Sequence, residues 1–184
     1  SQVDTDGDGI NDDVDNCPTV ANGYSTEGTT VAGGNEFGSA ANQLYWPRDI
    51  IIDASGNYYI ADKGNNRIQK WAPGATEGTT VAGGNAAGSA ANQLNSPGAI
   101  IMDASGNLYI ADILNNRIQK WVLGASEGVT VAGGNSSGSA ANQFNYPFGI
   151  TLDASGNLYI ADQNNFRIQK WALGQFDSDG DGIG

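Results

Sequence analysis

The chain has 184 residues, of which 39% are hydrophobic, and its 27 glycines and 5 prolines imply short elements joined by many turns. It carries 8 basic and 20 acidic residues, a net charge of −12, and no histidine. These numbers argue against a helical bundle, exclude histidine-dependent nucleophiles and histidine-ligated metals, and leave no basic cluster for nucleic acid or an anionic membrane.

The first 24 residues contain an acidic segment with the spacing of a calcium loop. Aspartates stand at positions 1, 3 and 5 of an EF-hand-type loop that starts at Asp4, and further oxygens follow at positions 7, 9 and 12. Calcium needs about 6–8 oxygen ligands, which alternating aspartates in a tight loop bring to one point. The predicted ligands are Asp4, Asp6, Asp8, Asp12, Asp15 and the carbonyl of Ile10.

This segment continues through Asn16-Cys17-Pro18 and resembles a thrombospondin type 3 repeat, an extracellular calcium-binding linker. Aspartate at the last loop position, where an EF-hand has glutamate, agrees with that pattern. The resemblance implies that Cys17 pairs with a cysteine of an adjacent repeat. This chain has no second cysteine, so the partner would lie in another molecule or outside this chain.

A repeat of 50 residues follows. Asp-Ala-Ser-Gly-Asn occurs three times from Asp53 onward, and Arg-Ile-Gln-Lys-Trp occurs three times from Arg67 onward, each time at an offset of 50 residues. Apolar and alternating runs between turn residues predict four short strands in each unit. In the first unit the predicted strands are 50–52, 58–60, 67–71 and 79–82. Four short antiparallel strands per unit are typical of a propeller blade.

The unit resembles the NHL repeat. The residues that carry the likeness are a proline, an apolar strand ending in Asp, a Gly-containing turn, a strand ending in Ala-Asp, then Asn-Arg-Ile and an aromatic residue, as in 97–121. The likeness spans roughly 25–174 and departs where Phe166 replaces the asparagine of the other copies. It implies a β-propeller, usually six-bladed and usually a binding or scaffolding platform.

Charged and aromatic residues that recur in every unit are interpreted as structural. Asp53, Asp62, Arg67 and their equivalents are expected to form turns and bonds between strands. The repeated tryptophans, beginning with Trp71, are expected to pack between blades.

The predicted strand order is incomplete at both ends. A strand expected at 29–32 precedes the first unit, and the third unit lacks its fourth strand. The predicted fold is therefore all-β, with three four-stranded blades that form half of a six-bladed ring or part of a larger assembly. Propellers close with about 4–8 blades, and exposed strand edges recruit partners. A reciprocal dimer, an open fibre of copies and further blades of a longer chain all remain open.

One face of the predicted blades differs among the three copies. The connection before each unit's first strand and the turn between its second and third strands lie on this face and vary in sequence. A contact surface has reason to diverge where scaffold positions repeat, although neutral drift is the alternative. The candidate contacts for a glycan or protein are Tyr45, Trp46, Arg48, Asp49, Lys63, Tyr146 and Phe148. Asn135 begins an N-glycosylation triplet.

The C-terminal residues begin a second calcium motif. Its predicted ligands are Asp177, Asp179 and Asp181, and positions 9 and 12 of the loop are absent. The missing ligands would come from a neighbour or from a longer polypeptide. The expected domains are thus a calcium-binding segment at 1–24, three NHL-type repeats at 25–174 and a truncated calcium repeat at 175–184.

These features favour a non-enzymatic extracellular structural module. Calcium-stabilised linkers would join blades that associate with further copies or blades. The alternative is a propeller whose variable face binds a carbohydrate or a cell-surface protein for adhesion. An enzyme is least favoured, since some NHL-like propellers resemble lyases that use metal-bound histidines and this chain has no histidine. No nucleic-acid partner is expected, and no membrane insertion, because no apolar run approaches the roughly 20 residues of a spanning helix.

Overall fold

The structure is a computed structural model that describes residues 27–173. The chain divides into two compact units, residues 1–31 and 32–184, and the blades belong to the second. The first blade consists of β1 (Pro47–Ile52), β2 (Tyr58–Asp62), β3 (Arg67–Trp71) and β4 (Thr79–Gly83). The second consists of β5 (Pro97–Met102), β6 (Leu108–Asp112), β7 (Arg117–Trp121) and β8 (Val129–Gly133). The third consists of β9 (Pro147–Leu152), β10 (Leu158–Asp162) and β11 (Arg167–Trp171).

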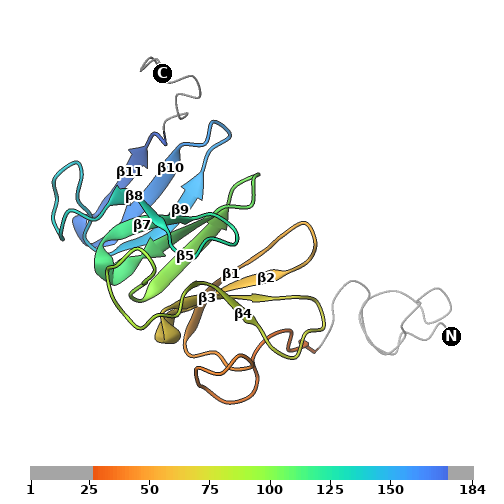
Figure 1. Cartoon of the computed structure of the whole chain (residues 1–184). Coiled ribbons are helices and arrows are strands. Elements are labelled where there is room, and N and C mark those ends of the chain that lie inside the picture. Colours follow the sequence, from red (N-terminus) through yellow and green to blue (C-terminus); the bar gives the residue numbers. More distant parts are fainter. Residues whose placement is uncertain (1–26, 174–184) are drawn as a thin grey trace, which may run out of the picture. The chain divides into compact units, whose positions relative to one another are not determined.

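Each blade is one antiparallel sheet in which neighbouring strands follow chain order (Figure 1). The first two sheets have four strands and the third has three. The prediction of an all-β fold built from propeller blades is confirmed, and within residues 27–173 the third unit has only its first three strands. Short 3-10 helices connect the second and third strands of each blade, at η1 (Lys63–Asn65), η2 (Ile113–Asn115) and η3 (Gln163–Asn165).

The repeated pentapeptide forms the turn between the first two strands because its aspartate caps it. Asp53 Oδ1 accepts hydrogen bonds from the main-chain N–H groups of Ser55 and Asn57, both at 2.9 Å. Gly56 follows with φ +81°, a conformation that glycine adopts without strain. The hydrogen bond from the Asn57 amide lowers the pKa of Asp53, and the equivalent bond lowers that of Asp153. The structural interpretation of Asp53 is confirmed.

The strand expected at 29–32 is wrong, because these residues belong to no strand. A strand is held by a ladder of hydrogen bonds to a neighbour. The expected neighbour was the third strand of a further blade, which this chain does not contain. The segment therefore lacks the partner that would make it a strand.

Two hydrophobic clusters join the blades. Trp121 of the second blade packs with Tyr59 and Ile68 of the first, in a cluster of nine buried residues. Trp171 of the third blade packs against the cluster between the second and third blades, where its ring centroid lies 5.4 Å from that of Phe144. The predicted packing role of these two tryptophans is confirmed. The second blade thus presents one apolar face to the first blade and the other to the third.

Candidate functional site

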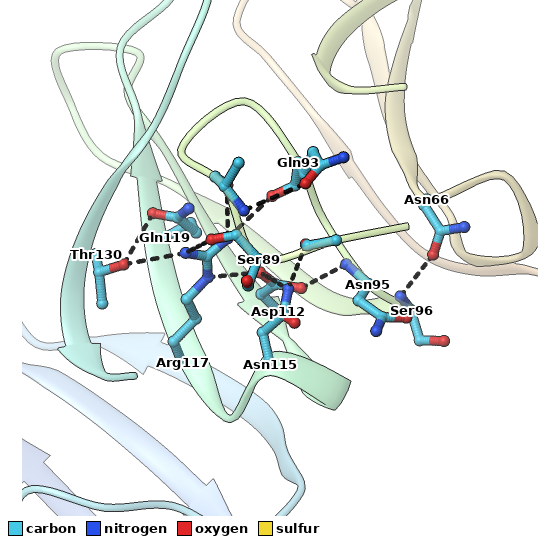
Figure 2. A network of polar contacts seen from close by, with 12 residues as sticks. Asn66, Ser89, Gln93, Asn95, Ser96, Asp112, Asn115, Arg117, Gln119 and Thr130 are labelled. Atoms are coloured by element: carbon cyan, nitrogen blue, oxygen red, sulfur yellow. Dashed lines mark hydrogen bonds and ion pairs between the residues drawn. The ribbon is translucent and has the colours of Figure 1, made fainter. Parts of the chain in front are cut away.

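A buried ion pair holds the variable loops of each blade in place. In the second blade, Asp112 has no exposed surface, and its Oδ2 accepts from Arg117 Nε at 2.7 Å and from Asn115 Nδ2 at 2.8 Å (Figure 2). The other carboxylate oxygen accepts from the main-chain N–H of Asn95 at 2.7 Å. Burial raises the pKa of Asp112. Three hydrogen bonds thus compensate the loss of hydration of this carboxylate.

The same arginine reaches across to the loop that connects two blades. The Arg117 guanidinium donates to the main-chain carbonyls of Ser89, Ala90 and Gln93 at 2.8, 3.1 and 3.0 Å. Equivalent ion pairs occur at Asp62–Arg67 and Asp162–Arg167, both at 2.7 Å. These charged residues are therefore the framework of the loop face, which confirms their structural interpretation.

An aromatic cluster lies on the loop face at the first blade. The rings of Tyr45 and Trp46 are stacked with centroids 4.6 Å apart, and Phe37 lies 5.5 Å from Tyr45. Trp46 is 66% exposed and Phe37 is also exposed. Phe37 is absent from the predicted contacts. It stands where the other two repeats have the small residues Ala87 and Ser137, and this difference in size could have predicted it as a contact.

The structure also brings together predicted contacts from different repeats. The Arg48 guanidinium lies over the Phe148 ring, 4.6 Å from its centroid, so β1 and β9 approach each other at this face. Asp49 Oδ2 accepts from the main-chain N–H of Ile100 at 2.8 Å and so links the first two blades. With Ala99, these three side chains line a pocket of about 270 Å³.

The other predicted residues are not gathered into this pocket. Lys63 begins η1 and is half-buried. The main-chain N–H of Tyr146 donates to Asn116 Oδ1 at 2.9 Å, a contact between the second and third blades. Asn135 is exposed, and its amide donates to the Asn142 carbonyl at 3.1 Å. Asn35 and Asn85 make the same contact, so this asparagine also shapes its loop.

The predicted calcium ligands and Cys17 lie outside the described residues. They are Asp4, Asp6, Asp8, Ile10, Asp12, Asp15, Asp177, Asp179 and Asp181. Within residues 27–173, no three His, Cys, Asp or Glu side chains are grouped so as to hold a metal ion. The same range has no helix long and apolar enough to cross a membrane.

Comparison with family models identifies the repeats. The model of the NHL repeat matches residues 44–71 and 144–171, and the model of the thrombospondin type 3 repeat matches residues 2–24. The chain therefore contains NHL repeats and an N-terminal thrombospondin type 3 repeat, a family that binds calcium and suggests an extracellular domain. No curated protein matches the chain.

Solved structures share the blade architecture at low sequence identity. A protein of unknown function from Bacteroides thetaiotaomicron is 23% identical, with a TM-score of 0.57 over 67% of this chain and 34% of its own. An auxiliary nutrient binding protein from the same species is 21% identical, with a TM-score of 0.54 over 66% and 36%. Virginiamycin B lyase from Staphylococcus aureus is 15% identical, with a TM-score of 0.49 over 71% and 39%. The first two likenesses show the fold alone, and the chain spans little more than a third of these structures.

Proposed function

We propose that this chain is a non-enzymatic extracellular assembly module whose end blades associate with blades of other copies. The observation that supports it is a set of apolar side chains left exposed at each end of the blade series. We define the free face of blade 1 by Ile50 and Ile52, and the free face of blade 3 by Tyr159, Ala161 and Ile168.

The free face of blade 3 carries the same residues that blade 2 buries against blade 3, but within the described chain no further blade covers it. Ile168 is 69% exposed, whereas Ile68 and Ile118 at the same position of the other blades are fully buried. Beside it, Ala161, Phe166 and Ile168 line a hollow of about 350 Å³. At the internal joint, Phe144 of the next blade packs with the equivalent Ala111 and Ile118.

The free face of blade 1 is the complementary half. Ile52 is 63% exposed and Ile50 is also exposed, whereas Ile100, the equivalent of Ile50 in the second blade, is buried against the first blade. Leu44 stands at the position of Phe144 and is only half-buried. Exposed apolar clusters of this kind mark sites of association.

Joining blade 3 of one copy to blade 1 of the next would repeat a contact that the chain makes twice internally. The contact is head-to-tail, so it either closes into a ring or propagates as a fibre. Two copies supply six blades, within the range of about 4–8 that closes a propeller. Further blades of a longer polypeptide would cover the same faces.

Calcium completes the proposed module. The alternating aspartates of the thrombospondin type 3 repeat supply the oxygen ligands that calcium prefers. Bound calcium would stiffen these segments into linkers, because without it their close carboxylates repel one another. An enzyme is not proposed, since the repeated Asp–Arg pairs of the described blades serve their own framework.

Solution mass tests this proposal directly. Light scattering after size exclusion, in calcium and in chelator, should give a mass of two copies or a larger species. Ile168→Asp places a charge in the free face of blade 3 and should reduce the mass to one copy. Leu123→Asp, at an exposed leucine of the middle blade, is the matched control and should leave the mass unchanged. A wild-type chain of one-copy mass at all concentrations would contradict the proposal.

A second candidate is adhesion to a glycan or protein through the exposed Trp46 ring and the half-buried Tyr45 ring stacked on it. Stacked aromatic side chains offer large, rigid contact area with few rotatable bonds. Binding to a glycan array that Trp46→Ala abolishes, with no change in mass, would favour this function.

A further inference from the structure

The two internal joints between blades share one polar contact on the loop face. Asn66 Oδ1 accepts from the main-chain N–H of Ser96 at 2.8 Å, as Figure 2 shows, and Asn116 Oδ1 accepts from that of Tyr146 at 2.9 Å. In both cases the asparagine follows the 3-10 helix of one blade and the partner precedes the first strand of the next. The contact therefore joins residues 30 positions apart and recurs at the 50-residue period of the repeat.

The third repeat has no acceptor at this position. Phe166 occupies it with the same left-handed backbone, at φ +54°, where Asn66 has φ +54° and Asn116 has φ +52°. Asparagine tolerates this conformation, whereas a bulky residue there is strained. The Phe166 side chain is 96% exposed, so its ring gains almost no packing within the described chain.

The receiving position on the first blade is also aromatic. Trp46 corresponds to Ser96 and Tyr146, and all three have positive φ, at +52°, +55° and +62°. Trp46 is largely exposed, and Tyr45 stacks on one side of its ring. The two unmatched ends of the series thus carry an exposed phenylalanine and an exposed tryptophan at the two positions that touch in every internal joint.

We propose that Phe166 of one copy packs against Trp46 of a second copy when blade 3 of the first meets blade 1 of the second. The inference rests on the proposed function, because it names the contact that fixes the joint between copies. An aromatic pair replaces the asparagine bond of the internal joints. Such pairs contribute beyond the area they bury. The exposure of both rings in the single chain follows from the absence of the second copy.

A double-mutant cycle on the full 184-residue chain tests this contact. The dimer or fibre dissociation constant is measured by sedimentation in calcium for wild type, Phe166→Ala, Trp46→Ala and the double variant. Each single change should weaken association about 3- to 10-fold. The double variant should be weaker by little more than the larger single effect, because both changes remove the same contact. Leu123→Ala is the control and should leave the dissociation constant unchanged.

A fifth variant checks the geometry. Phe166→Asn restores the acceptor of the internal joints, which bonds the main-chain N–H of residue 46 and not its side chain. Trp46→Ala should therefore have no effect on association in the Phe166→Asn background.

The outcomes separate this contact from the assembly itself. Single effects that multiply in the double variant, or single changes without effect on a wild type that associates, overturn the contact and leave the assembly standing. Loss of glycan binding in Trp46→Ala at unchanged mass also overturns it. A wild type of one-copy mass removes the proposed function, and this inference with it.

Discussion

The same isoleucine occurs at equivalent positions of blades 2 and 3, so truncating each one tests whether the free face of blade 3 is uncovered. Ile118 is fully buried between two blades, whereas Ile168 at the same position is 69% exposed. Truncation of a buried isoleucine to alanine costs about 2–5 kcal/mol, so Ile118→Ala should lower the free energy of unfolding by about 4 kcal/mol. Ile168 has only about a third of its surface covered, and Ile168→Ala in the separate chain should cost about 1 kcal/mol.

Urea unfolding followed by tryptophan fluorescence measures both changes. At a protein concentration low enough to keep the chain separate, the two variants should differ by about 3 kcal/mol. The cost of Ile168→Ala should then rise with protein concentration, because association buries the side chain. Equal costs at low concentration would refute the reasoning, since the third blade would then be covered within a single chain.

Three further changes test the framework. Arg117→Met should lower the free energy of unfolding in urea by about 3–5 kcal/mol, because it leaves the buried Asp112 carboxylate unpaired. Arg167→Met, in the more exposed pair of the third blade, should lower it by less, and equal losses would contradict this reasoning. Phe166→Gly should raise the unfolding free energy of the separate chain by about 1 kcal/mol by relieving the strain at φ +54°, and a loss of stability would contradict that strain. Stability should fall as the pH drops below about 4, because the lowered pKa values of Asp53 and Asp153 keep these carboxylates ionised in the folded state below their ordinary 3.8. The raised pKa of Asp112 acts in the opposite sense. Because Asp153→Asn removes one of the carboxylates whose pKa is lowered in the folded state, its thermal unfolding should show a flatter acid limb than wild type.

Repetition made most of the fold predictable from sequence. Aspartate and arginine recur in all three units at the positions of Asp62 and Arg67, which predicts a structural role in the blade. The ion pair between Asp62 and Arg67 confirms that role. The strand expected at 29–32 failed because a strand depends on a neighbour, which sequence periodicity does not supply. Blade pairing therefore had to come from three-dimensional contacts.

The candidate site was predicted only in part, because divergence shows that a position differs and not what it touches. Tyr45 and Trp46 were predicted as contacts and are stacked on each other. Asp49, predicted for the same face, bonds the next blade through the main chain of Ile100. Sequence shows that Phe166 departs from the asparagine of the other repeats but not what this position contacts. The Asn66–Ser96 bond supplies that information, because it joins this position of one blade to the residue before the first strand of the next.

The number of joints per association event decides between a ring and a fibre. Two copies that close reciprocally form two joints for one loss of translational and rotational freedom, which costs about 4–15 kcal/mol. A growing fibre forms one joint for each such loss. If the angle between blades permits closure, the ring therefore dominates at low concentration, since its second joint forms within the complex. The mass should then stay at two copies over a hundred-fold range of concentration, whereas a mass that rises steadily with concentration would mean that the blade angle prevents closure.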